Sequence, residues 1–183
     1  MLLKISASVG SGARKYMEDF IHVKVSKMAD GVHLNYVYLG LFDGHGGFHA
    51  AQFAKENLLR EITKQRRFWS SSDSDVSAAI KEGFLSTHNK MQKQAEFWPK
   101  SASGQACTSG TTATVVIIRN KRVFVGNVGD SSAVCGIVAQ SSENQHWNAE
   151  LITQVSENYN VTVLNDRRSY FQHSVLVITL LDS

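Results

Sequence analysis

The chain has 183 residues, of which 43% are apolar and 19% are charged, a balance that argues against wholesale disorder. Nineteen lysines and arginines against sixteen acids give a formal net charge of +3, and because the basic residues are scattered, composition does not predict a nucleic-acid surface. Cys107 and Cys135 are too few for a disulfide scaffold, Met1–Val9 has no signal-peptide pattern, and no apolar run reaches the roughly 18 residues of a membrane span, so a soluble intracellular protein is expected.

Strands and helices are predicted in a definite order. Residues 33–42 are rich in tyrosine, valine and leucine and predict a strand that ends at a glycine-rich turn. Apolar residues at helical spacing predict helices over residues 49–65 and 75–95. Further short strands, joined as an antiparallel meander, are predicted at residues 111–118, 123–128 and 132–138. This order favours an α+β layered domain over a doubly wound parallel sheet.

Two local features belong to the second predicted helix. The polar segment Ser70–Asp75 is predicted to be a loop whose serine or aspartate caps the helix. His88 falls on the apolar stripe of the helix, so we interpret it as a core or boundary histidine rather than a ligand.

The segment Arg14–Asp19 places a guanidinium before a pair of carboxylates. If the segment is a strand, Glu18 and Asp19 point to opposite faces, so that one could face a metal while the other holds a water or supports the site from behind. Arg14 would share the face of Glu18, and its planar fork suits a phosphate. A surface salt-bridge pair is the alternative interpretation.

The segment Phe42–Gly47 lies between a predicted strand and a predicted helix and contains three glycines, which let the main chain approach an ion or a phosphate closely. Asp43 is a hard oxygen ligand, and the carbonyl of Gly44 is a second. His45 carries an imidazole that could protonate a leaving oxygen. The alternative is a glycine-rich hairpin whose aspartate is satisfied locally.

Two later segments are weaker on their own. The hydroxyl side chains of Ser109–Thr114 could pack under a site and hydrogen-bond to the backbone, although a structural role is the simpler interpretation. Asp130 lies on the tight turn within Gly126–Ser132, where an aspartate needs no function unless it converges on Asp43.

Together these segments resemble, in this order, the motifs R-x-x-x-E-D, D-G-H-G-G, S-G-x-T-A and V-G-D-S of the metal-dependent protein phosphatases of type 2C, the PPM family. The resemblance covers residues 7–140. It implies an α+β fold, a four-layer αββα sandwich of two antiparallel sheets flanked by helices. It also implies a protein serine/threonine phosphatase that hydrolyses phosphoserine and phosphothreonine with a metal-activated water.

The resemblance implies a metal role for five residues. Two Mg²⁺ or Mn²⁺ ions are expected, bridged by Asp43, with the carbonyl of Gly44 as a further ligand. Glu18 would bind one metal directly or through water, and Asp19 would support it. Asp130 matches a position linked to a weaker third metal.

The resemblance also implies catalytic residues and partners. Arg14 would hold the substrate phosphate, and His45 would be the general acid. Within the family, several segments are most similar to the delta-type members that act in DNA-damage signalling: Arg14–Asp19, Ala51–Asn57, Glu96–Pro99 and Ser109–Arg119. This implies a monomer that acts on phosphorylated proteins in the nucleus or the cytoplasm, with no direct contact to nucleic acid or membrane.

The C-terminal part departs from the family pattern, which completes its metal site with aspartates in Ser-Asp-Gly and Asp-Asn segments. All thirteen glycines lie at or before Gly136, and the later Asp166 and Asp182 match neither segment. We therefore divide the sequence into residues 1–154, the N-terminal part of a phosphatase domain, and residues 155–183, a divergent tail. Weak metal binding and little turnover are expected of this chain alone.

Three interpretations stay open for a chain that lacks these ligands. It is a phosphatase fragment or an incomplete gene model, a catalytically inactive isoform that acts as a binding module, or an unstable product. Residues 159–164 and 174–181 could pair as a hairpin that covers part of an exposed sheet edge.

Overall fold

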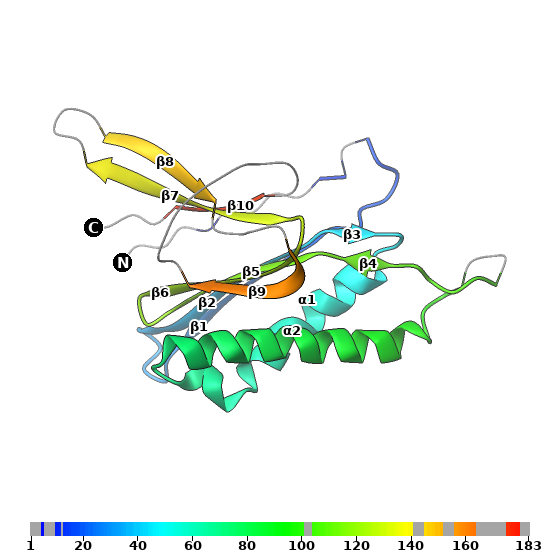
Figure 1. Cartoon of the computed structure of the whole chain (residues 1–183), viewed down its shortest axis with the longest axis horizontal. Helices are drawn as coiled ribbons and strands as arrows, with labels where there is room; N and C mark the ends of the chain where they lie inside the picture. The colour runs from blue at the N-terminus through cyan, green and yellow to red at the C-terminus, as the bar shows by residue number, and fades with distance from the viewer. Residues whose placement is uncertain are drawn as a thin grey trace.

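The computed structural model describes residues 5, 10–11, 13–100, 104–140, 145–151, 156–163 and 175–179, with the backbone alone from residue 135 onward. Its helical layer consists of α1 (His49–Thr63) and α2 (Asp73–Ala95), joined by a short 3₁₀ turn, η1 (Arg66–Trp69). Both helices lie on one face of a twisted sheet, as Figure 1 shows. Within the described residues, no helix is long and apolar enough to cross a membrane.

The sheet beneath the helices has five strands in the order β1-β2-β5-β6-β9, and every neighbouring pair in it is antiparallel. Its strands are β1 (Phe20–Lys27), β2 (Leu34–Phe42), β5 (Ala113–Arg119), β6 (Arg122–Gly129) and β9 (Ser156–Val163). The central strand β5 is buried along its whole length, because the helices cover one of its faces and a second sheet covers the other.

A second sheet of three strands, in the order β10-β7-β8, lies on the opposite side of the first (Figure 1). Its strands are β7 (Ser132–Gln140), β8 (Gln145–Leu151) and β10 (Val175–Thr179), and a two-residue ladder joins β3 (Gly44–His45) to β4 (Gly110–Thr111). The α+β layered class is confirmed. Among the described residues helices lie on one side of the sandwich only, and β10 pairs with β7 in parallel rather than antiparallel.

Strand β2 shows how the sequence builds two separate cores. Side chains alternate between the two faces of a strand, so Tyr36, Tyr38 and Phe42 face the helices, whereas Val37 and Leu39 face the second sheet. All five residues are buried. An almost continuous apolar run is therefore required here, as expected for a strand covered on both faces.

The predicted helices are confirmed, with small shifts at their ends. The second helix begins at Asp73 rather than at residue 75, and its N-cap residue Ser72 makes no side-chain cap hydrogen bond. Instead, the Ser70 hydroxyl donates to the Asp75 carboxylate at 2.9 Å. The interpretation of His88 as a core or boundary residue is wrong, because the helix turns it to the exposed side while Thr87 faces inward.

The predicted meander is only half correct. Strands β5 and β6 form the expected hairpin, and its turn residues Asn120 and Lys121 both have positive φ angles, as a two-residue type I′ turn requires. Strand β7, in contrast, does not pair with β6 but crosses to the second sheet. The register of β6 slips between Asn127 and Gly129, and Gly129 has a φ of 95°, so the backbone leaves the sheet there.

The predicted hairpin between residues 159–164 and 174–181 is wrong. Strand β9 adds to the open edge of β6, whereas β10 pairs with β7 in the other sheet. Each segment satisfies its backbone groups on a different free sheet edge, so the two strands do not meet each other.

The two helices pack closely at Gly83. A Cβ on Gly83 would lie 2.9 Å from the Cα atom and 3.0 Å from the backbone nitrogen of Ile62 in α1. Backbone atoms cannot give way as a flexible side chain can, so only glycine allows this approach.

We therefore expect Gly83→Ala to lower the free energy of unfolding by about 1–3 kcal/mol through overpacking, although alanine alone favours a helix by about 1 kcal/mol. Urea unfolding at pH 7 measures the change. The control is Glu82→Ala, an exposed position on the same helix, where a change within about 0.5 kcal/mol is expected. Equal stability of Gly83→Ala and the parent chain would contradict the close packing.

Glu61 is a charged residue buried between the helices, with 1% of its side chain exposed. Burial alone would raise the pKa of its carboxyl, but hydrogen bonds from Lys64, Lys90 and Ser86 outweigh that effect and hold the pKa at about 2. The Lys90 ammonium donates to Oε1 at 2.6 Å, and the Ser86 hydroxyl donates to Oε2 at 2.7 Å. The carboxylate therefore ties α1 to α2.

This ion cluster predicts a pH dependence of stability. Because the pKa of Glu61 is lower in the folded chain than in the unfolded one, its contribution is complete above about pH 5 and is lost as the pH falls toward 2. Urea unfolding of Glu61→Gln should show a loss on the order of 2–3 kcal/mol at pH 7 and a smaller loss at pH 3. A loss that is the same at both values would contradict the ionic role.

Candidate active site

Asp43 lies directly after β2, and its backbone is held by two threonines from a distant part of the chain. Its N–H donates to the Thr112 hydroxyl at 3.2 Å, and its carbonyl accepts the Thr112 N–H at 2.9 Å and the Thr111 hydroxyl at 3.2 Å. Because the backbone N–H of Thr112 donates to Asp43, the predicted strand over residues 111–118 is interrupted at Thr112 and forms two strands, β4 and β5. The backbone of Asp43 is thus fixed before any ligand arrives.

Gly44 is needed because the chain passes very close to the segment that holds Glu18. A Cβ on Gly44 would collide with the backbone carbonyl oxygen of Glu18 and would lie 3.1 Å from the Ala51 Cβ in α1. Gly46 and Gly47 then have φ angles of 67° and 120°, which L-residues with side chains rarely adopt. The glycine turn thus lets the end of β2 and the start of α1 meet the N-terminal segment.

The two neighbouring acids Glu18 and Asp19 point to different partners, although β1 begins only at Phe20. The Glu18 carboxylate accepts a hydrogen bond from the Gly47 N–H at 2.7 Å and so braces the glycine turn. The Asp19 carboxyl faces Asp43 and accepts the backbone N–H of Gly44. The segment is not a strand, so the premise of the predicted alternation is wrong, but the two carboxyl groups do have different partners, with Asp19 on the side of Asp43.

The electrostatics of Asp19 show that two carboxyl groups are held together. Partial burial and the negative charge of Asp43 raise the pKa of Asp19 above its usual value, against the Gly44 N–H and the positive charge of Arg14. Because Asp19 and Asp43 repel each other at the end of β2, a cation bound beside them would lower the free energy of the folded chain. Arg14 is exposed and close enough to act on the same carboxyl.

Ser109 supplies the cap that α1 lacks in its own sequence. The N-cap residue Phe48 makes no side-chain cap bond, but the Ser109 hydroxyl accepts the Ala50 N–H at 3.0 Å and donates to the Gly47 carbonyl at 2.6 Å. The predicted hydrogen bonding of the hydroxyls of residues 109–114 to the backbone is therefore confirmed, in the structural role that was the simpler interpretation. One serine satisfies groups on both sides of the helix start.

Buried hydroxyls connect the turn that carries Asp130 to the backbone of Asp43. The Thr112 and Ser131 hydroxyls lie 2.7 Å apart, and Thr112 also holds the N–H of Asp43. Asp130 itself is exposed on the turn between β6 and β7. The fourth motif therefore converges on the same corner of the fold as the second.

His45 is exposed at the end of β3, and its ring lies against Gly110 of the paired strand β4. A Cβ on Gly110 would lie 2.9 Å from the His45 Cε1 atom, so a side chain at this position would push the ring away from β4. The structure thus places His45 at the surface of the turn that carries Asp43, with the ring supported from below.

The described residues fit one part of a divalent-cation site. Asp43 and Asp19 provide carboxylate oxygens, which are the donor atoms that Mg²⁺ and Mn²⁺ prefer. Within the described residues, however, no group of three His, Cys, Asp or Glu side chains is arranged to hold a metal. The arrangement can attract a cation and a phosphate, and further oxygen ligands are needed to enclose a metal.

Comparison with known families decides the assignment. The family described as Protein phosphatase 2C matches residues 3–156. The chain belongs to the protein phosphatase 2C family. The site described above thus lies in the part of the chain that the family match covers.

Individual relatives support the assignment. The chain is 37% identical over 124 residues to probable protein phosphatase 2C 59 of Arabidopsis thaliana, a match that covers 67% of this chain and 35% of that protein. It is 31% identical over 137 residues to a probable protein phosphatase 2C of Caenorhabditis elegans, covering 75% of this chain and 35% of the relative. The chain spans about a third of the length of the curated relatives that it matches.

Solved structures share the fold. The serine-threonine phosphatase 2C of Toxoplasma gondii superposes with a TM-score of 0.60 at 17% sequence identity, over 78% of this chain and 46% of that one. A bacterial serine phosphatase superposes with a TM-score of 0.56 at 18% identity, over 82% of this chain and 65% of that one. The layered arrangement of a protein phosphatase 2C is therefore present in this chain.

The structure adds supporting residues that the sequence did not single out one by one. Thr112 and Ser131 link Asp43 to the β6–β7 turn, and Thr114 donates to the side chain of the buried Asn127 at 2.6 Å. The signal for the threonines was the dense run of hydroxyl residues before a β-branched strand. Asn127 carried no signal, because a single asparagine in a predicted strand does not indicate by itself which side chain it contacts.

Thr112 gives a testable prediction for this network. Thr112→Val keeps the shape of the side chain but removes its bonds to Asp43 and Ser131, so the free energy of unfolding should fall by about 1–3 kcal/mol. Chemical denaturation measures the loss. Thr112→Ser retains the hydroxyl and should recover much of it; a loss in Thr112→Ser with none in Thr112→Val would show that the methyl group, not the hydrogen bonding, matters.

Proposed function

We propose that this protein phosphatase 2C domain hydrolyses phosphoserine and phosphothreonine in proteins with the help of divalent metal ions. The observation that carries the proposal is the pair formed by Asp19 and Asp43, which the glycine turn and Thr112 force together against their mutual repulsion. Holding two like charges together raises the free energy of the folded chain, and a cation between them removes that cost.

The proposed metal ligands are the carboxyl and carbonyl oxygens of the residues in and near the acidic pair of Asp19 and Asp43. Asp43 and the Gly44 carbonyl hold Mg²⁺ or Mn²⁺, with Glu18 and Asp19 on the facing segment and Asp130 on the nearby turn. The Gly47 N–H occupies only part of the accepting capacity of Glu18, since a carboxylate has two oxygens. Bound divalent ions would supply a water nucleophile near neutral pH and stabilise charge at the phosphoryl group.

Two further side chains are proposed to handle the substrate. Arg14 is exposed beside the acidic pair, and its guanidinium binds two phosphate oxygens in the fork geometry that suits an anion. His45, supported on Gly110, donates a proton to the leaving serine or threonine oxygen. Both are placed at the surface, where a protein substrate can reach them.

We also propose a specific cellular role within the family, which the motifs indicate. The similarity of Arg14–Asp19 and Ser109–Arg119 to delta-type members supports a role in DNA-damage signalling. The corresponding location is the nucleus or the cytoplasm. The partners are phosphorylated proteins, and the chain acts as a monomer without binding nucleic acid or membranes.

A second candidate function is a binding module that recognises phosphoproteins without turning them over. It is favoured by the same described residues, in which no three acidic, histidine or cysteine side chains converge on a metal. In this case Arg14 and the cation-attracting pair would retain a substrate, but the nucleophile would not be activated.

The two functions separate in a phosphatase assay with a phosphothreonine peptide and Mn²⁺. We expect little turnover from the 183-residue chain, but turnover from a chimera in which residues 155–183 are replaced by the C-terminal part of the Arabidopsis relative. Asp43→Ala should lower the rate of the chimera roughly 100-fold or more. The parent and variant chimeras must show the same cooperative melting.

Two outcomes would change the conclusion. A folded chimera that is inactive with Mn²⁺ would contradict the phosphatase proposal. Turnover by the 183-residue chain itself, abolished by Asp43→Ala, would show that this chain already holds a sufficient ligand set, and it would overturn the expectation of weak activity.

A further inference from the structure

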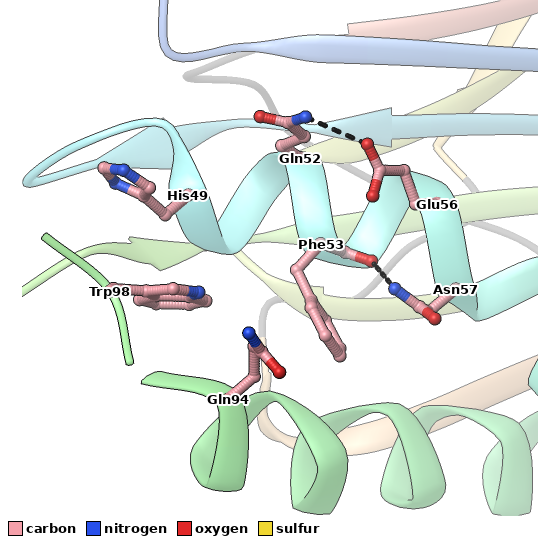
Figure 2. Close-up of a pocket in the computed structure, with 7 residues that line it drawn as sticks. All are labelled: His49, Gln52, Phe53, Glu56, Asn57, Gln94 and Trp98. Carbon is pink, nitrogen blue, oxygen red and sulfur yellow. Dashed lines mark hydrogen bonds between the residues drawn. The ribbon is translucent and has the colours of Figure 1, made fainter. Parts of the chain in front are cut away.

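A cavity of about 310 Å³ lies between α1 and the end of α2, away from the acidic pair but next to the start of α1. Figure 2 shows its two walls. One face of α1 lines the upper wall, and Gln94 with the following Trp98 closes the lower one. The volume is at the lower end of the range that small ligands or single side chains occupy in proteins.

Aromatic rings form one end of this cavity. The His49 ring stacks on Trp98 with a centroid separation of 5.7 Å and an interplanar angle of 29°, and the ring of Phe48 stacks on His49 with a centroid separation of 4.3 Å. Phe53 extends from α1 toward α2 in the same cavity (Figure 2). The π faces of these rings are negative and attract cations.

The polar groups of the cavity are rich in acceptors. The amide nitrogen of Gln52 donates to the Glu56 carboxylate at 2.9 Å, and that of Asn57 donates to the Phe53 carbonyl at 2.8 Å. One N–H of each amide is therefore used within α1. The Glu56 carboxylate and the Gln52 carbonyl oxygen remain as hydrogen-bond acceptors on the cavity wall.

The cavity wall also carries the negative charge of Glu56. Glu56 is exposed, and within the described residues it forms no ion pair. Arg60 is the nearest basic residue along this face of α1, but its guanidinium donates to Asn57 at 2.6 Å and lies 3.8 Å from the Glu61 carboxylate. An anion would meet Glu56 unfavourably, whereas a cation meets a carboxylate, an amide oxygen and aromatic faces.

We propose that this cavity binds a basic side chain, arginine above all, from the peptide segment of a protein substrate. A guanidinium is planar and stacks on aromatic rings while its edges donate to carboxylate and amide oxygens. This inference rests on the proposed phosphatase function, because it makes the cavity a specificity subsite for a residue near the phosphorylated one.

The cavity is joined to the candidate active site through the first turn of α1. His49 lines the cavity, and the preceding Gly47 donates its N–H to Glu18 at 2.7 Å. The Ser109 hydroxyl fixes this same turn by accepting the Ala50 N–H. A peptide that reaches from the acidic pair along the start of α1 therefore meets the aromatic end of the cavity first.

The test uses unphosphorylated peptides without metal, so that its result does not depend on turnover. The ¹⁵N-labelled 183-residue chain is titrated at pH 8 with a peptide that carries one arginine, and the indole N–H signal of Trp98 reports binding. The chain has three tryptophans, and Trp98→Phe assigns the signal. The matched peptide has citrulline in place of arginine, which keeps the shape and removes the charge.

We expect a saturable shift of the Trp98 signal with the arginine peptide and a dissociation constant roughly three- to tenfold weaker for the citrulline peptide. Glu56→Gln should weaken the arginine peptide by a similar factor and leave the citrulline peptide unchanged. Glu82→Gln removes the same charge from an exposed position of α2 and should change neither constant.

Three results would overturn the proposal. They are equal affinity for the arginine and citrulline peptides, equal effects of Glu56→Gln and Glu82→Gln, and the lack of any saturable shift at Trp98. A further arm uses N-acetyl-arginine amide; if it binds as tightly as the peptide, the cavity takes free cations, and the assignment to a peptide substrate is wrong. Loss of phosphatase activity in the chimera, by contrast, leaves these binding results untouched.

Discussion

The hydrogen bonds that Thr111 and Thr112 form with the backbone of Asp43 are the constraint on which the rest of the site depends. Three hydrogen bonds between these residues join the end of β2 to the junction of β4 and β5, two segments that are far apart in the chain. Once this backbone is fixed, Gly44 lies against the segment of Glu18, and Asp19 is brought beside Asp43. The acidic pair is thus imposed by the packing of uncharged groups, because the carboxylates themselves repel.

Helix α1 connects this corner to the remainder of the molecule. Its first turn is fixed by Ser109 and by the bond between Gly47 and Glu18, its buried face packs on the sheet, and Glu61 near its end is tied to α2. Two very different environments for a carboxylate result. Lysine side chains of this chain neutralise the charge of Glu61. Asp19 and Asp43, in contrast, repel each other, and a bound cation would reduce that repulsion.

The helices, the β5–β6 hairpin and the strand β2 could be predicted because each depends on a local pattern: helical spacing, a short turn between two β-branched runs, or a run of apolar residues. The course of the chain after Gly129 could not. The sequence of a tight turn is the same whether the next strand pairs with the preceding strand or crosses to another sheet. Which of the two happens depends on which sheet edge has unpaired backbone groups. His88 was misplaced for a related reason, since one residue at the border of an apolar stripe can turn to either side.

The sequence by itself determined which chemical groups stand at the ends of the strands: the acids of Arg14–Asp19, the Asp43 turn with its glycines, the hydroxyl run and Asp130, and with them the protein phosphatase 2C family. Only the tertiary structure decided that Asp19 rather than Glu18 faces Asp43, that Ser109 caps α1, and that a cavity opens between the two helices. The physical reason is the range of the interactions. Backbone preferences and amphipathic patterns act over a few residues, whereas the direction of a side chain is set by neighbours that only the packed layers bring together.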